Sequence, residues 1–115
     1  MKKKTVGSVK RKAWTAFSLW VRNRDRGVCF TCGGNGNQAG HYIPRSLSSF
    51  LYFNEDNVHA QCFRCNINLF GNSDEYAARL GEEVVKRLRA DKTKHKQWSI
   101  KELEELIAKY DTPST

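Results

Sequence analysis

Apolar residues recur at helical spacing in the first quarter of the chain. Between residues 9 and about 24 they fall on one face of a helix, while basic and polar residues fall largely elsewhere. The apolar positions are Ala13, Phe17, Trp20 and Val21. Gly27 follows as a C-terminal stop. The pattern predicts an amphipathic helix with a basic outer face and an aromatic stripe turned to the core.

The middle of the chain predicts two short strands and a short helix. The strands cover residues 38–43, where Pro44 ends the run, and residues 56–61. The helix runs through Asn66 to Phe70 and is closed by Gly71. We therefore expect a strand, strand, helix unit at the centre of the fold.

Two more helical segments follow. Asn72 with Glu75 offers a capped start for a helix that runs through Leu88, although Gly81 can break it. A later capping box, Ser99 with Glu102, opens a last helix. The central unit is therefore flanked by helices on both sides.

The length of 115 residues suits one domain. We expect this domain over residues 9–110, a disordered basic arm over 1–8 with a hinge at Gly7 and Ser8, and a loose tail over 111–115. No run approaches the ~20 apolar residues of a membrane span. The basic start has no apolar run behind it, so it does not match a signal peptide, and we expect a cytoplasmic protein without membrane contact.

Four cysteines form two Cys-x-x-Cys pairs, Cys29 with Cys32 and Cys62 with Cys65. The two-residue spacer lets both sulfurs of a pair face one centre, and four thiolates suit one tetrahedral Zn²⁺. Disulfides are the alternative, but the doublets and the missing signal favour a reduced chain. The structural zinc would help to fold so small a domain.

The charge is unevenly placed. Nine of the 20 Lys and Arg residues lie in residues 1–26 with a single acidic residue, so this quarter carries the whole formal excess of +8. A basic arm leading into a helix favours a nucleic acid as the partner, although a solubilising tail is the alternative. The expected DNA contacts are Lys10, Arg11, Lys12, Arg22 and Arg45.

The residues between and after the cysteine pairs are the types that phosphodiester cleavage requires. His41 can act as a base, or can be a structural histidine. Asn66 follows the last cysteine, and its amide oxygen can bind Mg²⁺ or Mn²⁺ or can cap a helix. Strand alternation places Asn57, His59 and Gln61 on one face, where Asn57 can hydrogen-bond the strand of His41.

This order of Cys-x-x-Cys, Gly-His, Asn and Cys-x-x-Cys-Asn resembles the HNH, or ββα-metal, endonucleases with a structural zinc. Residues 38–42, 53–62 and 65–66 resemble more closely the phage NinG (Rap) family of recombination nucleases. Residues 17–24, Gly71 and Asn72 with Tyr76, and the late Trp98 with its helix also fit that family. The resemblance spans most of residues 13–110.

The resemblance implies roles for the site. His41 would be the general base, Asn57 its orienter and Asn66 a ligand of the catalytic Mg²⁺ or Mn²⁺, while the four cysteines would hold zinc. Family members act on branched DNA, including Holliday junctions, during phage recombination, which places the protein in the bacterial host cytoplasm.

Gly40 departs from the wider HNH pattern, in which many members carry a metal-binding Asp before the catalytic His. Our hypothesis is that His59 supplies the missing ligand, with Asp56 or Glu55 as the fallback. The alternative is that His59 only packs or hydrogen-bonds a phosphate.

We therefore expect an α+β fold with a zinc-stapled, HNH-like core, and a metal-dependent endonuclease that cuts branched DNA. Cutting two strands of a junction needs two sites, so a homodimer is expected. The alternatives are a general HNH nuclease that nicks or cuts duplex, and a non-catalytic zinc-ribbon module that binds nucleic acid.

Overall fold

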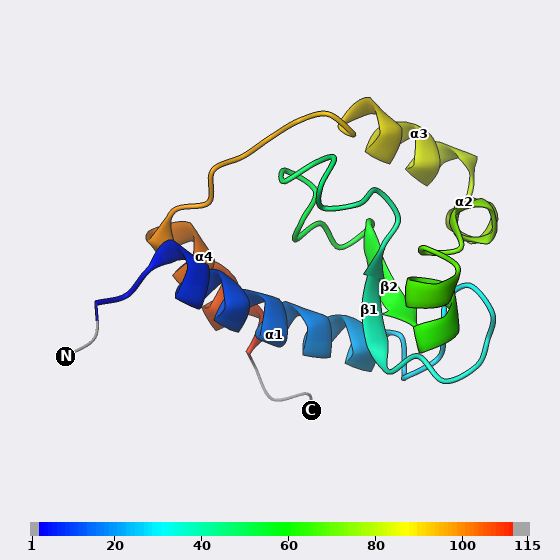
Figure 1. The fold of residues 1–115 in the computed structure, drawn as a ribbon, viewed down its shortest axis with the longest axis horizontal. Helices are drawn as coiled ribbons and strands as arrows, with labels where there is room; N and C mark the ends of the chain where they lie inside the picture. The colour runs from blue at the N-terminus through cyan, green and yellow to red at the C-terminus, as the bar shows by residue number, and fades with distance from the viewer. Residues whose placement is uncertain (1–2, 112–115) are drawn as a thin grey trace.

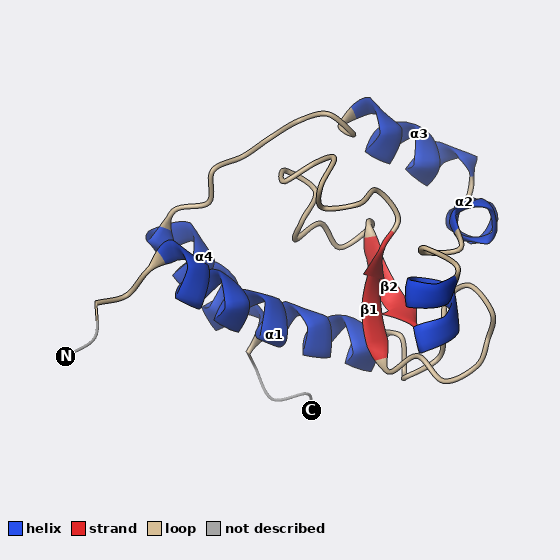
Figure 2. Cartoon of the chain, viewed as in Figure 1, coloured by secondary structure: helices blue, strands red, loops and turns tan. Residues whose placement is uncertain are grey.

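The computed structural model of the chain describes residues 3–111 and has an α+β architecture, as expected (Figure 1). Its elements are helix α1 (Val6–Arg24), strands β1 (Gln38–His41) and β2 (Val58–Gln61), the π-helix η1 (Arg64–Asn68), and helices α2 (Ser73–Leu80), α3 (Glu82–Ala90) and α4 (Ile100–Tyr110). Figure 2 shows long loops between these elements, including residues 42–57 and 91–99. Apart from Asp111, the expected tail lies outside the described residues.

Helix α1 begins three residues earlier than expected, so the prediction of a disordered arm through residue 8 is wrong for residues 6–8. Thr5 caps the helix: its Oγ1 accepts from the Ser8 backbone N–H at 3.1 Å, and the Ser8 hydroxyl oxygen accepts from the Thr5 N–H at 3.3 Å. This is a capping box with Ser in place of the usual Glu or Gln. Gly7 and Ser8, expected as a hinge, therefore lie in the first helical turn, while residues 1–2 lie outside the described part.

Helix α4 lies alongside α1, and the two share the larger core (Figure 1). The aromatic stripe of α1 is part of this core, as predicted: Phe17 is fully buried and packs edge-on against Tyr110 of α4 and Phe53 of the 42–57 loop. The Ser99 capping box that opens α4 is also confirmed, with Glu102 as its partner. A smaller core gathers around the fully buried Tyr76 of α2.

The two strands pair antiparallel over four residues each, shorter than predicted, with Gly40 opposite His59 and His41 opposite Val58. Because side chains alternate along a strand, Ala39 and His41 face α1, whereas Gln38 and Gly40 face η1. Asp25, at the end of α1, accepts from the Ala60 backbone N–H and so covers the outer edge of β2. The sheet therefore presents two chemically different faces.

The helix predicted through Asn66 to Phe70 is a five-residue π-helix, η1, that begins two residues earlier, inside the second cysteine pair, and ends at Asn68. Gly71, with φ +92°, follows it, as the expected stop. Gly81, with φ +89°, divides the next segment into α2 and α3, which confirms the predicted break. In residues 3–111, no helix is both long and apolar enough to cross a membrane.

Candidate functional site

The four cysteines meet at one end of the sheet. Their Sγ atoms all lie within 4.8 Å of one another, and Cys32 Sγ is 3.7 Å from Cys62 Sγ. Two backbone amides point at these sulfurs: Gly34 N–H at Cys32 and Cys65 N–H at Cys62. Such donors stabilise thiolates, the form that binds a metal.

The quartet fits Zn²⁺. A tetrahedral ion with Zn–S bonds of ~2.3 Å separates its sulfurs by ~3.8 Å, close to the spacing of Cys32 and Cys62. All four cysteines are free thiols rather than disulfides, so each sulfur can serve as a ligand. The site joins the loop after α1 to the start of η1, so a bound ion would stabilise the fold and hold Asn66, the neighbour of Cys65, in place.

His41 lies at the end of β1 on the α1 face. Its imidazole stacks on Trp14 of α1, with ring centroids 5.0 Å apart, and its Nε2 is 3.0 Å from the backbone oxygen of Tyr52. Trp14 and Tyr52 come from a helix and a loop that flank the ring. Neither had a predicted role, because their contact with His41 arises only in the folded chain.

The hydrogen bond to Tyr52 fixes the tautomer of His41. A carbonyl oxygen only accepts, so Nε2 carries the proton and Nδ1 keeps its lone pair. Burial lowers the pKa of His41 to about 4; the Tyr52 carbonyl opposes this shift and the positive charge of Arg45 adds to it. At neutral pH the ring is therefore uncharged, with a nitrogen able to take a proton.

Asn57 anchors the loop that provides the Tyr52 carbonyl. It is fully buried, its Oδ1 accepts from the Ile43 N–H at 2.7 Å, and its Nδ2 donates to the carbonyls of Ile43 at 3.0 Å and Leu51 at 3.3 Å. Asn57 thus bonds the backbone that continues from His41, as the sequence suggested. It also fixes the residue before Tyr52, a contact that the sequence did not suggest.

Asn66 faces the opposite side of the sheet from His41. Its Nδ2 donates to Gln38 Oε1 at 2.9 Å, and its Oδ1 lies beside Gly40, where an added Cβ would be only 2.8 Å away. Gln61 Oε1 is buried beside the same glycine and would overlap that Cβ. Amide oxygens are hard donors of the kind that Mg²⁺ and Mn²⁺ accept, so the residues around Gly40 fit such an ion in donor type.

His59, paired with Gly40 across the sheet, lies on this second face. Its ring stacks on Phe30 with centroids 4.0 Å apart, and its Nδ1 is 3.2 Å from the Tyr76 hydroxyl. That hydroxyl donates to the Gly40 carbonyl at 2.7 Å, so it accepts from Nδ1–H. Burial lowers the pKa of His59 to about 4, and the charge of Arg24 acts in the same direction. A neutral ring with its proton on Nδ1 leaves Nε2 able to bind a metal, and this role stays a prediction.

The two fallback carboxylates are held elsewhere. Glu55 accepts from the Tyr110 hydroxyl of α4 at 2.7 Å, and Asp56 pairs with Arg87 of α3 at 3.3 Å. In residues 3–111, the four cysteines are the only cluster of three or more His, Cys, Asp or Glu side chains close enough to share an ion. In residues 3–111 no second group of three or more such side chains is available, so amide oxygens would have to contribute to a second metal site.

Three of the five predicted DNA contacts gather beside His41. Lys10, Arg11 and Arg45 line a cavity of about 420 Å³ whose wall includes Trp14 and Tyr52, the two residues that contact the His41 ring. The Lys10 ammonium lies 4.5 Å from the centre of the Tyr52 ring, and Arg45 donates to the Tyr52 hydroxyl at 3.2 Å. This cavity, here called the Lys10 pocket, combines positive charge with an aromatic wall.

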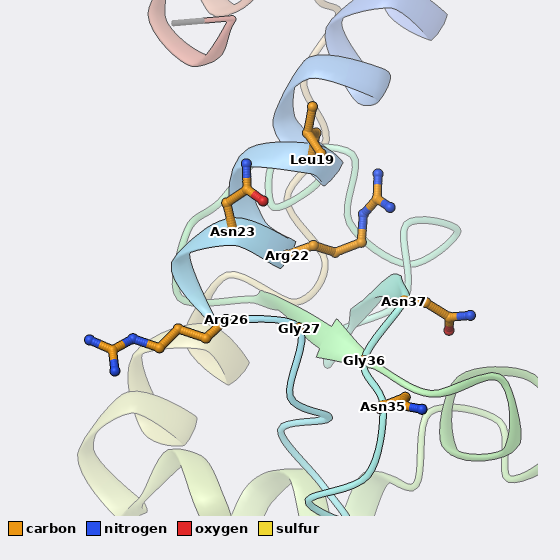
Figure 3. Close-up of a pocket in the computed structure, with 8 residues that line it drawn as sticks. All are labelled: Leu19, Arg22, Asn23, Arg26, Gly27, Asn35, Gly36 and Asn37. Carbon is orange, nitrogen blue, oxygen red and sulfur yellow. The ribbon is translucent and has the colours of Figure 1, made fainter. Parts of the chain in front are cut away.

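The other two predicted contacts lie apart from the Lys10 pocket. Lys12 lines a neighbouring cavity between α1 and α4. Arg22 lines a pocket at the far end of α1, together with Arg26 and the amides of Asn23, Asn35 and Asn37 (Figure 3). In this view Arg22 extends to the side on which Asn35 and Asn37 lie, and Arg26 extends the other way. The basic residues thus follow the length of α1 rather than forming one site.

A family model and the most similar curated proteins place the chain near the same group of phage proteins. A family model described as "Bacteriophage Lambda NinG protein" matches residues 1–114. The chain is 33% identical over 108 residues to a protein named ninG of Escherichia phage lambda, and 32% identical to those of Escherichia phage 933W and Salmonella phage P22. These alignments cover 87% of this chain and 52–53% of the relatives, so the chain spans about half their length. No solved structure matches.

Proposed function

The chain belongs to the NinG family of phage lambda, and on that premise we propose that it is a metal-dependent DNA endonuclease with His41 as its general base. The observation that carries the proposal is the fixed tautomer of His41. The Tyr52 carbonyl holds the proton on Nε2, so Nδ1 is an unprotonated acceptor. Trp14 and Tyr52, which contact the His41 ring, also line the positively charged Lys10 pocket.

The chemistry assigned to His41 is transfer of one proton. Nδ1 takes a proton from water, the water oxygen forms a bond to phosphorus, and the bond from phosphorus to the 3′ oxygen breaks. The products are a 5′ phosphate and a 3′ hydroxyl, and the leaving oxygen takes a proton from solvent. An anionic phosphate nearby also favours the imidazolium, which makes His41 a stronger base than its pKa in the free protein indicates.

Residues of the second face would hold the metal. Mg²⁺ or Mn²⁺ near Asn66 would stabilise negative charge on the phosphate and on the leaving oxygen. Asn66 extends from η1 directly after a zinc-binding cysteine, and its Nδ2 bond to Gln38 turns Oδ1 toward Gly40. Asn57 acts at a distance, through the loop that aligns Tyr52 with His41.

The basic residues along α1 support DNA as the substrate. Lys10, Arg11 and Arg45 would contact phosphates next to the scissile bond, and Arg22 would contact a phosphate farther along the same helix. Because each phosphate contact releases counterions, binding should weaken steeply with salt. The same chemistry would operate in the host cytoplasm of a phage.

Branched DNA and a dimer complete the proposal. A junction offers two strands to cut, and each chain would supply one site. An exposed apolar group around η1 supports a second copy of this chain as the partner: Phe63, Ile67, Leu69 and Phe70, of which Phe70 is 90% exposed. Sedimentation of the zinc-loaded chain at several concentrations tests this part, and a monomer at all of them in the presence of junction DNA would contradict it.

The deciding experiment is cleavage of a labelled four-way junction and of a matched linear duplex with Mg²⁺ or Mn²⁺. We expect the wild type to cut the junction and His41→Ala to bind DNA without cutting it. Equal cutting of both substrates would leave a general HNH nuclease without a preference for branches. Absence of cutting by folded, zinc-loaded wild type would favour the non-catalytic zinc-ribbon module.

A further inference from the structure

Gln61, the last residue of β2, is a fully buried polar side chain of the central unit to which the proposed chemistry gives no role. Its Nε2 donates to Thr31 Oγ1 at 3.1 Å and to the Gly71 carbonyl at 2.9 Å. Its Oε1 is the only buried side-chain polar atom in residues 3–111 without a hydrogen-bond partner. Such an atom in a folded protein calls for a specific reason, and an ion is one of them.

The orientation of this amide is determined by its neighbours. The Gly71 carbonyl can only accept, so the nitrogen of the Gln61 amide must face it. Rotating the amide by half a turn would set its oxygen against that carbonyl. Oε1 is therefore held against Gly40 of β1, where it gains at most a weak C–H contact.

Gly40 provides the space for that oxygen. Its φ angle is not in the left-handed region, so the backbone does not require glycine there. The space does: an added Cβ would overlap Gln61 Oε1 and lie 2.8 Å from Asn66 Oδ1. Two amide oxygens from different elements thus converge at the place where a side chain of residue 40 would begin.

We propose that Gln61 Oε1 and Asn66 Oδ1 are two protein ligands of a hard divalent cation, in place of the carboxylate that Gly40 cannot supply. This inference rests on the proposed nuclease function and deepens it. Both ligands are neutral, so the cation keeps its full charge, which favours weak binding to the free protein and strong attraction to DNA phosphates. Carbonyl oxygens and water suit Mg²⁺ or Mn²⁺, whereas thiolates such as those of the cysteine quartet suit Zn²⁺.

The alternative is that Gln61 only connects the zinc-binding loop to β1 through hydrogen bonds. Two variants distinguish a metal-binding Gln61 from a purely structural one, because each removes the pair of converging amide oxygens in a different way. Gln61→Met keeps the length of the side chain but removes the oxygen. Gly40→Ala keeps glutamine at position 61 but places a methyl group where the two oxygens converge, so the Gln61 amide has to move away from that place. Thr31→Val is the matched control, since it removes one hydrogen bond of the Gln61 amide while the Gly71 carbonyl still orients Oε1. It also removes the 3.3 Å contact of Thr31 Oγ1 with Cys29 Sγ, so its zinc content is compared with that of the wild type.

The measurement is Mn²⁺ binding to the full, zinc-loaded chain, followed by the electron paramagnetic resonance signal of free Mn²⁺. Zinc content and thermal unfolding are recorded for each variant, so that a misfolded protein is recognised. We expect Gln61→Met and Gly40→Ala to weaken Mn²⁺ binding roughly tenfold or more, and Thr31→Val to stay within about twofold of the wild type. Folded Gln61→Met and Gly40→Ala proteins that bind Mn²⁺ as the wild type does would overturn the inference.

Asn66→Ala separates this inference from the proposed function. If Asn66→Ala weakens Mn²⁺ binding and the two variants at Gly40 and Gln61 do not, the inference about Gln61 is wrong and a metal-dependent nuclease still stands. If the wild type binds Mn²⁺ through Gln61 but His41→Ala cleaves DNA as fast as the wild type does, the proposed role of His41 fails and the cation site remains. A wild type that binds no Mn²⁺ overturns the inference directly.

Discussion

Replacing Asn57 with Ala should strongly destabilise the protein. The side chain makes three hydrogen bonds to backbone groups of Ile43 and Leu51 from a fully buried position. Each such bond contributes about 1 kcal/mol net, and a stranded buried donor such as the Ile43 N–H costs about 1–3 kcal/mol. We therefore expect a loss of about 3–4 kcal/mol in the free energy of unfolding, a large part of the ~5–15 kcal/mol of an ordinary domain.

Urea denaturation of the zinc-loaded protein measures this loss, and Asn54→Ala is the matched control. Asn54 Oδ1 accepts from the N–H groups of Asp56 and Asn57, but Asn54 is only partly buried and the Asn57 N–H also reaches the Asn54 carbonyl. Its removal should cost no more than about 1 kcal/mol, because water and the carbonyl replace the lost acceptor. Equal losses for the two variants would refute the assignment of Asn57 as the anchor of the loop.

The same substitution has a consequence at His41. Without the anchor, the Tyr52 carbonyl is free to leave the ring and water can enter, so the pKa of His41 should rise from about 4 toward the ordinary 6.5. Titration of the imidazole by NMR detects this change in the folded variant. An unchanged His41 titration in a destabilised Asn57→Ala would mean that the loop holds its shape without Asn57.

Four further predictions follow from the fold and the site. The pKa of His41 is lowered to about 4 in the folded protein, so between pH 6.5 and 4 the unfolded chain binds a proton that the folded chain does not. The free energy of unfolding should therefore fall by up to about 3 kcal/mol as the pH drops from 6.5 to 4. His41→Gln should remove this part of the pH dependence, as measured by urea unfolding. Removal of zinc by a chelator should lower the unfolding temperature and expose the core, as circular dichroism and dye binding would report; unchanged unfolding would argue against a structural ion. Thr5→Ala should cost about 1 kcal/mol, measured by urea unfolding, through loss of the capping box of α1. A Lys10→Ala, Arg45→Ala double variant should reduce the salt dependence of DNA binding by about two phosphate contacts, and an unchanged slope in a fluorescence titration would remove the Lys10 pocket from the DNA-binding surface.

The sequence predicted the elements best where a local rule was strong. The aromatic stripe of α1 follows helical spacing, Gly81 interrupts the next helical segment, and Ser99 with Glu102 forms a capping box, and all three are found in the structure. The start of α1 was wrong because Ser8 replaces the usual Glu or Gln of a capping box. The spacing of the cysteines predicted their cluster, since a Cys-x-x-Cys turn is set by local geometry.

The surroundings of the candidate site were harder to predict because they depend on contacts between distant segments. Nothing local to Tyr52 indicates that its carbonyl meets His41, eleven residues earlier. Leu51 and Phe53 of the 42–57 loop are buried, and residues 91–99 cross this loop: Ser48 donates to the Asp91 and Lys94 carbonyls. Strand alternation placed Gln61 on the correct face. The lack of a hydrogen-bond partner for its Oε1 could not be predicted, because it depends on contacts with Gly40, Thr31 and Gly71 in the folded chain.

The proposed base and the proposed metal ligands lie on opposite faces of the sheet, and this limits where a scissile phosphate can bind. His41 and Gly40 are neighbours in β1, so the base points to the α1 face while the amide oxygens lie on the η1 face. A phosphate can meet both only around an edge or an end of β1. The outer edge of β2 is closed by α1, because Asp25 accepts from Ala60 N–H and Arg24 donates to the Val58 carbonyl. In the described part of the chain no strand pairs with the outer edge of β1, and Gly71 lies beside only its last residue, at the His41 carbonyl. The scissile phosphate should therefore lie along β1, between the Lys10 pocket on one face and Asn66 on the other.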